Sequence, residues 1–470
     1  MLLSLWAGSL CAQSAADSLP IGQHFVVVRT IQIEGNTRTR HHIITRELNI
    51  HPGDTIDLAL LPMLLQQERN KIFNTRLFVT VDVKAAPALP DSLPQYLERD
   101  VIILLKERWY FFPSVIFELA DRNFNEWWEQ RGRDLSRTNY GIRLSQRNFR
   151  GRNERLKLKL QGGFTKKYEL LYEVPYLNRQ QKAGGSVMFS YITQKNVAFD
   201  VKDHTLEFLG SSDETLLTRF TTGLTYGRRH GFFTNSAFSL QFVYNTIADT
   251  LAELNPNYFL NGRTHQRYFQ ASYRFDWDRR DIKAYALRGH QLWVTLGRAG
   301  LLPSDDFHRT SITALGALYR PLGHQFYWSG SVSGQLTTRA RQPFAQFQAL
   351  GYGQELVRGY NRYVINGQHY GLLRNTLRKR LFSYQTDLNF IPLRQFRTIP
   401  VALYIKGFSD LGYVYNPLAT EQNARFTNQP LWGTGLGLDL VTFYDAVFRI
   451  EWAINAQAET GFFLNFRSEF

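Results

Sequence analysis

Cysteine, methionine and long apolar runs are nearly missing from this sequence. Its 470 residues include one cysteine and three methionines. The cysteine, Cys11, lies in an apolar opening stretch that is typical of the core of a secretory signal peptide. Cleavage near Ala12 or Gln13 leaves a mature chain without cysteine, which excludes disulfides, thiolate chemistry and cysteine-based metal sites. We therefore expect a signal peptide over residues 1–13, a linker over residues 14–24 and export across an inner membrane.

The lack of any run of eighteen apolar residues excludes a protein that crosses a membrane with helices. It does not exclude a β-barrel, because apolar residues that alternate with polar ones keep the mean hydropathy low, here −0.31. Aromatic residues make up 14% of the chain. Together with the scarcity of methionine, this favours strands over helices.

Acidic residues are too few to balance the basic ones, and the formal net charge is +15. The basic side chains are scattered through alternating segments and match no nucleic-acid-binding motif, so we expect no nucleic-acid partner. A barrel lumen, or loops that meet anionic outer-leaflet lipid, accounts for the charge as well. No phosphate-binding loop follows a strand. We expect no enzyme activity, no cofactor and no metal site.

Residues 25–108 predict a small α+β domain with the element order β-α-α-β-β. A strand that begins at Phe25 ends at a Gly-Asn turn, and Thr37 or Thr39 can cap a helix that runs to about Leu48. A second helix with leucines on one face follows, and then two more strands.

This domain resembles a polypeptide-transport-associated (POTRA) domain. The resemblance rests on Ile33 and the turn residues Gly35 and Asn36, and on Phe78 at the start of the second strand. It implies a periplasmic module that receives extended chains as an added strand at its sheet edge. A domain of the same order that only spaces or docks the rest of the chain is the alternative.

Alternation with a period of two takes over from residue 109 to residue 470. In residues 155–161 every second residue is leucine, and three of the others are basic. An Arg or Lys on the lipid face of a barrel costs about 2–4 kcal/mol at the midplane, so these cations must line a lumen. Seventeen candidate strands occur; because the barrel needs an even number, we discard residues 202–210, which polar stretches flank. The sequence thus predicts a transmembrane antiparallel barrel of 16 strands, with a soluble β-sandwich or propeller as the alternative.

The last strand of the chain alternates most regularly and ends in Phe470. Such an ending resembles the C-terminal recognition signal of bacterial outer-membrane barrels. The outward apolar residues of the first and last strands define the expected lateral seam, which comprises Val115, Phe117, Leu119, Phe462, Leu464, Phe466 and Phe470.

Residues 350–360 form a glycine-rich, charged interruption of the alternation. Three glycines within nine residues permit backbone angles that other residues resist, so this segment is a loop. Its Val-Arg-Gly-Tyr sequence at 357–360, with segments 148–153, 408–415 and 435–437, resembles the BamA/TamA-type outer-membrane assembly and two-partner secretion superfamily, also called the bacterial surface antigen superfamily.

The resemblance implies a loop that folds from outside into the lumen, where its arginine meets acidic residues of the inner wall. The family's Glu-Leu-Arg on the next strand begins here with Thr376, so one acceptor is missing, and Glu355 is the residue expected to replace it. The residues assigned to this latch are Arg358, Gly359, Tyr360, Asp410 and Glu355.

The resemblance also implies an outer-membrane protein of a Gram-negative bacterium that captures extended client chains in the periplasm and templates them at the seam. Its partners are then unfolded outer-membrane or secreted proteins, membrane lipid and accessory assembly proteins. Three alternatives stay open: a two-partner-secretion-type pore for one dedicated substrate, the barrel of a patatin-type autosecreted protein, and a catalytic barrel using acids near residues 276–290. The Asp-x-Arg-Asp sequence at 278–281 resembles a structural turn of the family, which argues against the last of these.

Overall fold

The structure is a computed structural model. It describes residues 25–87, 97–119, 127–128, 132–178, 182–211, 214–338, 341–387, 398–442 and 446–467. The expected signal peptide and linker, and Phe470, lie outside these residues.

The N-terminal domain packs two helices against a four-stranded sheet of order β2-β1-β4-β3. β1 and β4 are parallel at the centre of this sheet, and β2 and β3 form its edges. The elements are β1 (Phe25–Glu34), α1 (His41–Thr45), β2 (Thr55–Asp57), α2 (Leu61–Phe73), β3 (Phe78–Pro87) and β4 (Leu97–Glu107).

The first helix differs from the sequence expectation, and β2 was not expected. α1 covers only His41–Thr45, and its N-cap is Arg40 rather than a threonine. The hydroxyl of Thr37 and the backbone N–H of Thr39 donate instead to the carboxylate of Glu107, at 2.8 and 2.7 Å. A tertiary partner at the end of β4 therefore takes the groups that a helix cap would have used.

The rest of the chain forms one antiparallel sheet of 16 strands, so the predicted fold class is confirmed. β10 (Asn196–Lys202) and β11 (Thr205–Gly210) pair only with each other, which confirms that residues 202–210 are not a barrel strand. The 16 strands are β5 (Phe111–Leu119), β6 (Thr138–Phe149), β7 (Glu154–Gly163), β8 (Thr165–Val174), β9 (Ala183–Gln194), β12 (Leu217–Arg229), β13 (Thr234–Ile247), β14 (His265–Asp278), β15 (Gly289–Ala299), β16 (Arg309–Gly323), β17 (Phe326–Thr337), β18 (His369–Asp387), β19 (Thr398–Tyr415), β20 (Pro430–Thr442), β21 (Ala446–Asn455) and β22 (Thr460–Arg467).

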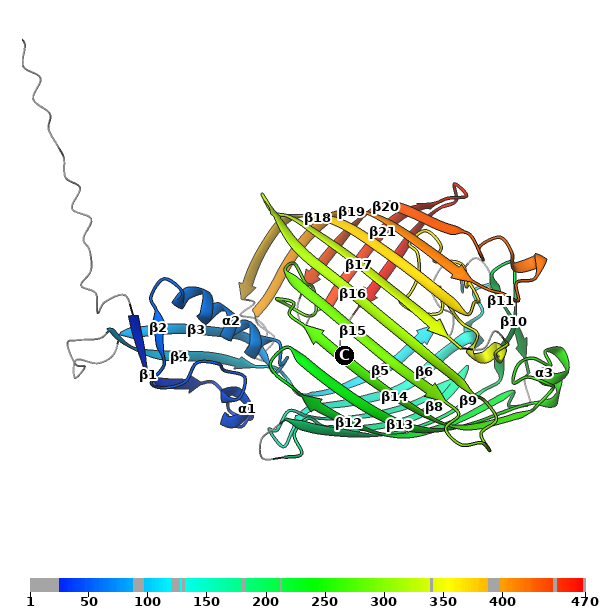
Figure 1. Cartoon of the computed structure of the whole chain (residues 1–470), viewed down its shortest axis with the longest axis horizontal. Coiled ribbons are helices and arrows are strands. Elements are labelled where there is room, and N and C mark those ends of the chain that lie inside the picture. Colours follow the sequence, from blue (N-terminus) through cyan, green and yellow to red (C-terminus); the bar gives the residue numbers. More distant parts are fainter. Residues whose placement is uncertain are drawn as a thin grey trace, which may run out of the picture.

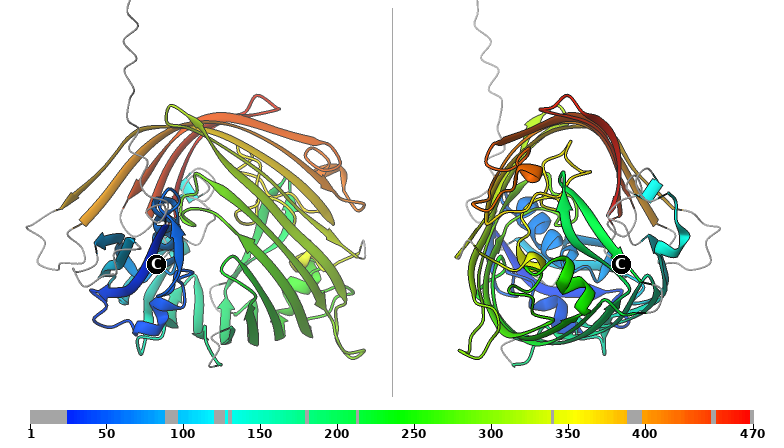
Figure 2. Two further views of the ribbon diagram at one scale, coloured as in Figure 1. Left: turned by 60° about the vertical axis from the view of Figure 1, so that its left-hand side comes forward. Right: turned by 90° about the vertical axis from the view of Figure 1, so that its right-hand side faces the viewer.

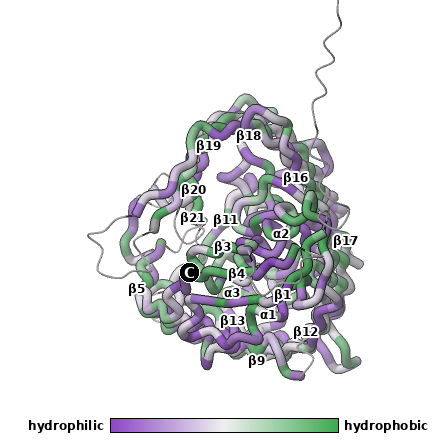
Figure 3. Tube along the Cα trace, turned by 90° about the vertical axis from the view of Figure 1, so that its left-hand side faces the viewer, coloured by the Kyte–Doolittle hydropathy of each residue, from purple (hydrophilic) through white to green (hydrophobic). Residues whose placement is uncertain are grey.

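The sheet curves round on itself into a barrel, and the N-terminal domain lies at one end of it (Figures 1 and 2). Seen from that end, the elements of the domain stand in front of the ring of strands (Figure 3). We call this the domain end and the opposite end the far end. The short helix α3 (Asp249–Leu254) and the β10–β11 hairpin lie at the far end (Figure 1). No helix in the described parts of the chain is long and apolar enough to cross a membrane.

Alternation along the strands separates the outer wall from the inner wall, as β19 shows. Ile405 and Leu411 are exposed on its outer face, whereas Lys406, Phe408 and Asp410 are buried on its inner face. This arrangement places charged side chains in the interior of the barrel, where the latch loop also lies.

Candidate functional site

The segment between β17 and β18 folds back into the barrel and is anchored by apolar side chains. Leu350, Val357 and Tyr360 are almost completely buried, and they pack against Val414 of β19 and Leu431 of β20. Leu350 also forms an isolated antiparallel bridge across the base of the loop. This apolar cluster fixes the loop on the inner wall before any charge is considered.

Two glycines allow the loop to turn. Gly351 and Gly359 have φ angles of +88° and +100°, which favour glycine. A Cβ atom on Gly351 would also lie 2.2 Å from the carbonyl oxygen of Tyr363. Glycine therefore permits left-handed backbone angles at Gly351, near the base of the loop, and at Gly359, directly after Arg358.

Arg358 at the tip of the loop binds Asp410 in a bidentate arrangement. Its Nε lies 2.7 Å from one carboxylate oxygen and its Nη2 lies 2.5 Å from the other. The backbone N–H of Arg358 donates to the same carboxylate at 3.1 Å. Asp410 is 0% exposed, so this carboxylate depends entirely on protein partners.

Three further groups of the inner wall surround the same guanidinium. Its Cζ lies 3.9 Å from the ring centroid of Phe408, and its Nη2 donates to Thr376 Oγ1 at 3.1 Å. Glu451 of β21 lies 3.8 Å from Nη1. Thr376 thus contacts the arginine at the position where the resemblance implies a glutamate, and Glu451 supplies a second negative charge.

Glycines of β20 make room for this arrangement. A Cβ atom on Gly433 would lie 1.8 Å from the carbonyl oxygen of Arg358, and one on Gly435 would lie 2.7 Å from the ring of Phe408. A Cβ atom on Gly437 would lie 2.9 Å from the side chain of Lys406. Gly433, Gly435 and Gly437 therefore lie on the inner face of β20, where the lack of side chains leaves space for the loop and its charged partners.

A second ionic cluster adjoins the first on the domain side. Lys406 Nζ lies 2.5 Å from Asp439 and 2.8 Å from Glu451, so Glu451 links the two clusters. The hydroxyl of Tyr285, from the connection between β14 and β15, donates to Asp439 at 2.9 Å. Arg358, Arg374, Arg378, Lys406 and Arg449 line an adjacent cavity of about 420 Å³.

The structure brings Arg358, Gly359, Tyr360 and Asp410 together and leaves Glu355 out. Glu355 accepts a hydrogen bond from Ser333 at 2.9 Å, so the expectation that it replaces the missing acceptor is wrong. Glu451 takes that place instead. Its inward position follows from the alternation of β21, but its contact with Arg358 depends on the register of β19, β20 and β21, in which Gly437 separates Lys406 from Glu451.

A buried histidine joins the β10–β11 hairpin to the latch region from the far end. The carbonyl of His204 accepts from the backbone N–H of Val364 at 2.8 Å, and its Nε2 accepts from that of Phe426 at 3.0 Å. Phe426 in turn packs edge-on against Tyr360, with the ring centroids 5.2 Å apart. His204 is 1% exposed, and burial lowers its pKa to about 4; the nearby Arg425 also lowers it, whereas Asp203 opposes this.

This contact is expected to weaken in acid. His204 is neutral when folded, whereas in the unfolded state it binds a proton below about pH 6.5, so its contribution to stability falls by about 3 kcal/mol as the pH falls to about 4. Hydrogen exchange of residues 201–205 and 423–427, corrected for intrinsic rates, should rise between about pH 7 and about pH 4.5. His204→Gln keeps an acceptor for Phe426 and should remove most of this increase; an unchanged increase would contradict the role of His204.

The turn between β6 and β7, part of the segment 148–153, docks the N-terminal domain on the barrel. Asn148 Nδ2 donates to Thr39 Oγ1 at 2.9 Å, and the backbone N–H of Arg40 donates to the carbonyl of Gly151 at 3.0 Å. A Cβ atom on Gly151 would lie 2.3 Å from the carbonyl of Arg38, so glycine allows this close approach.

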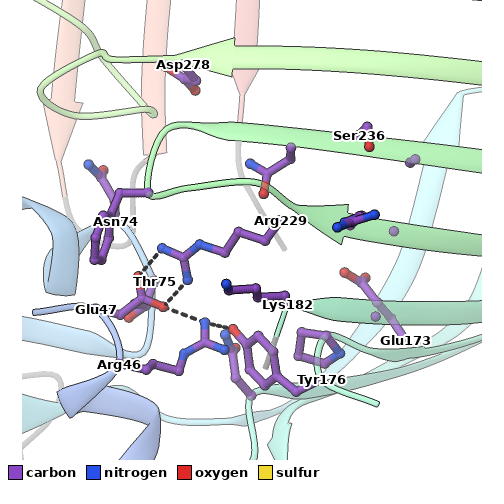
Figure 4. A pocket seen from close by; sticks show the side chains of 18 of the residues that line it. Arg46, Glu47, Asn74, Thr75, Glu173, Tyr176, Lys182, Arg229, Ser236 and Asp278 are labelled. Carbon is purple, nitrogen blue, oxygen red and sulfur yellow. Dashed lines mark hydrogen bonds and ion pairs between the residues drawn. The ribbon is translucent and has the colours of Figure 1, made fainter. Parts of the chain in front are cut away.

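A second junction contact is ionic and lines a cavity of about 440 Å³ (Figure 4). Glu47 follows α1 and accepts two hydrogen bonds from Arg229 of β12, at 2.7 and 2.9 Å, and a further one from Arg46. Burial opposes ionisation of Glu47, but these two arginines outweigh it and lower its pKa. Burial lowers the pKa of Arg46 to about 10, so it stays charged at neutral pH.

The residues that carry the POTRA resemblance are structural in this domain. Phe78 is completely buried in the core, and Ile33 packs against that core. Gly35 has a φ of +90°, and a Cβ atom on it would lie 1.9 Å from the carbonyl of Leu105. Asn36 Nδ2 donates to the carbonyl of Thr39 at 3.1 Å. Gly35 and Asn36 thus shape the turn between β1 and α1, whereas Ile33 and Phe78 contribute to the core.

β5 and β22 are the two ends of the 16-stranded sheet, and their described residues are not paired with each other. Four predicted seam residues are the most exposed large apolar residues of the barrel strands: Val115 (83%), Phe117 (75%), Leu464 (70%) and Phe462 (68%). An interior strand is covered by neighbours on both sides, whereas an end strand is covered on one. Leu119 is half-buried. The side chain of Phe466 and all of Phe470 lie outside what the structure describes.

Comparisons with known proteins agree for both parts of the chain. Residues 148–465 match the Omp85 superfamily domain, and residues 26–108 match the POTRA family described as surface antigen variable number repeat. No curated protein matches the chain. Among solved structures, 94% of this chain aligns with 83% of BamA from Haemophilus ducreyi lacking POTRA domains 1-3, at 14% identity and a TM-score of 0.51. The same share aligns with 75% of CdiB from Escherichia coli, at 12% identity and a TM-score of 0.53. At these identities the likeness concerns the fold.

Proposed function

The chain belongs to the Omp85 superfamily, and from this we propose that it inserts client proteins into the outer membrane through the seam between β5 and β22. It is an outer-membrane protein of a Gram-negative bacterium, with its POTRA domain in the periplasm. The family acts in insertion or export without being enzymes, so the choice between these two roles is what the proposal adds.

The observation that carries the proposal is the exposed pair of sheet ends. An end strand offers a row of backbone N–H and C=O groups that an extended chain can pair with. In the wall of a barrel this edge faces lipid, and Val115, Phe117 and Leu464 are exposed beside it. A client strand that pairs there buries its backbone polar groups and presents its apolar side chains to lipid in one step.

The POTRA domain offers a separate edge for capture. β3 pairs with β4 on one side and with no other described strand on the second side. Its exposed residues there include Asp82 and Lys84, which form an ion pair at 2.6 Å. The proposed route of a client therefore begins at β3 in the periplasm and ends at the seam.

The latch supports this proposed route by stabilising the barrel wall next to the β22 edge. Arg358 holds the loop against β18, β19 and β21, which are near the β22 edge in the order of the sheet. We infer that the latch keeps the C-terminal part of the wall rigid while β22 opens. The latch and seam residues are thus parts of one assembly device, and lipid and accessory proteins are its further partners.

Depletion of this protein, followed by quantification of the whole outer-membrane proteome, tests the proposal. We expect the amounts of many barrel proteins to fall together, because each of them needs an edge on which to pair. Loss of one or two secreted proteins with the barrels unchanged would instead identify a dedicated exporter. Re-expression of the intact chain provides the control for secondary effects of depletion.

A further inference from the structure

The periplasmic ends of β18 and β19 form a two-stranded ribbon that extends past both neighbouring strands (Figures 1 and 2). β17 pairs with β18 only as far as Lys379, and β20 pairs with β19 only from Ala402 onward. Beyond these points residues 384–387 of β18 pair with residues 398–401 of β19, and within the described residues neither segment pairs with a further strand. Residues 381–383 likewise have no partner strand on the β17 side. We call residues 381–387 and 398–401 the periplasmic ribbon.

The ribbon lies outside the apolar layer of the membrane. An apolar band about 25 Å tall, crossed at a tilt of 35–45°, takes about ten residues of a strand. Measured from the exposed Tyr413 near the far end, such a band reaches about Leu403, which pairs with Phe382. Past Phe382, the five residues from Ser383 to Asp387 rise about 3.3 Å each along the strand, which at the same tilt carries them roughly 13 Å toward the periplasm.

A β-bulge gives the ribbon one apolar face and one polar face. The register shifts between Arg380 and Phe382, so that Phe382 and Tyr384 lie opposite Leu403 and Val401. Phe382 and Tyr384 are exposed, and their rings stack with centroids 5.8 Å apart. Ser383, Gln385 and Asp387 lie on the opposite face of β18, and Thr386 follows Tyr384 on the aromatic face. Apolar and polar side chains thus continue to alternate along β18 beyond the apolar layer of the membrane.

The two edges of the ribbon identify what fits it. Backbone groups along 381–387 and 398–401 point sideways without a partner strand in the described residues, apart from Pro400, which has no N–H, and another extended chain can pair with such a row. The apolar face favours an occupant that also alternates, because its apolar side chains then extend the same face. In the sheet order β22-β21-β20-β19-β18, residues 381–387 of β18 lie four strand spacings, roughly 20 Å, from the β22 edge of the seam.

We propose that the periplasmic ribbon is a second client-binding edge, at which an extended, alternating segment of a client adds as a strand alongside residues 381–387. The inference rests on the proposed function for the identity of the occupant. The ribbon holds a client strand on the periplasmic side of the membrane near the seam, between capture at β3 and insertion at β22.

Site-specific photo-crosslinking on the full chain in lipid nanodiscs tests this. The probe is a synthetic peptide with the sequence of residues 460–470, which alternates as a barrel strand does, and a scrambled peptide of the same composition is its control. With the photoreactive residue at Ser383, we expect a peptide crosslink at least about tenfold above that at Leu418, an exposed residue at the far end. The scrambled peptide should lose most of this signal.

A double variant, Phe382→Asp with Tyr384→Asp, places charge on the apolar face without shortening a strand. It should lower the crosslink at Ser383 by about tenfold while the folded barrel keeps its mobility on gels. Crosslinks at Ser383 to lipid alone, or equal peptide crosslinks at Ser383 and Leu418, would overturn the proposal. Phe382 and Tyr384 would then be only an aromatic pair at the membrane surface.

Two further positions separate this inference from the proposed function. The same peptide is tested with the photoreactive residue at Lys84 of β3 and at Val115 of β5. Crosslinks at these two positions without one at Ser383 reject the ribbon and leave the insertion function intact. Absence of crosslinks at all three positions rejects both.

Discussion

Arg358→Ala should lower the free energy of unfolding of the barrel by about 3–5 kcal/mol, because it leaves the fully buried carboxylate of Asp410 without its bidentate partner. The apolar cluster around Leu350 and Tyr360 should still hold the loop inside the barrel, so the expected product is a folded but heat-sensitive protein. The temperature at which the folded form disappears on gels measures the loss. Insertion of client barrels into liposomes should fall with it.

A matched control for this substitution is Arg425→Ala. Arg425 also pairs with a carboxylate, Glu459, at 2.5 Å, but its side chain is 51% exposed, so its loss should cost less than about 1 kcal/mol. Asp410→Ala combined with Arg358→Ala should cost less than the sum of the two single changes, because the partners share one interaction. Simple additivity would show that Arg358 is only one of several solvated lumen cations.

The glycines on the inner face of β20 give an independent test of the same latch. Gly433→Ala leaves both charges in place but puts a Cβ atom 1.8 Å from the carbonyl of Arg358, so it should displace the loop and lower heat stability. Gly371→Ala, where a Cβ atom meets nothing within 4 Å, should have little effect. If Gly433→Ala and Arg358→Ala both match the intact protein in heat stability and insertion, the latch has no role.

Glu47→Ala should release the POTRA domain from the barrel. Glu47 is 6% exposed and accepts hydrogen bonds from Arg229 and Arg46, so its removal leaves these two guanidinium groups without a carboxylate partner at the junction cavity. The cost to the docked arrangement is about 3–5 kcal/mol. Electron–electron resonance distances between spin labels on cysteines at Met63 and Leu177, both exposed, should change from one narrow distribution to a broad one.

Two variants make this experiment decisive. Asp82→Ala removes an exposed ion pair within the same domain and should leave the distance distribution narrow. Arg229→Ala removes the barrel's half of the junction and should release the domain as Glu47→Ala does. A narrow distribution in Glu47→Ala would mean that the remaining junction contacts, among them Asn148–Thr39, Arg40–Gly151 and Asn74–Asp281, dock the domain without the carboxylate.

Most of the fold could be predicted from the sequence because strand alternation is a local property. Alternation with a period of two separates the side chains that face lipid from those that face the lumen. Because a lipid-facing cation is costly, the basic side chains of residues 155–161 are predicted to point inward. The need for an even strand number, together with the polar stretches around residues 202–210, was enough to remove that segment from the barrel. Arg358 and Asp410 came from motif and face assignment, both of which use only neighbouring residues.

The tertiary structure decided the contacts between residues far apart in the chain, because these contacts depend on strand register and on the space between side chains. Alternation placed Glu451 inside the barrel, but only the register across Gly437 brings it to Lys406 and Arg358, while Glu355 turns to Ser333. The sequence alone determined the barrel, its strands and its inward charges. The second carboxylate beside Arg358, the ionic docking of the POTRA domain and the periplasmic ribbon were decided by the tertiary structure, since each arises where separate strands end or meet.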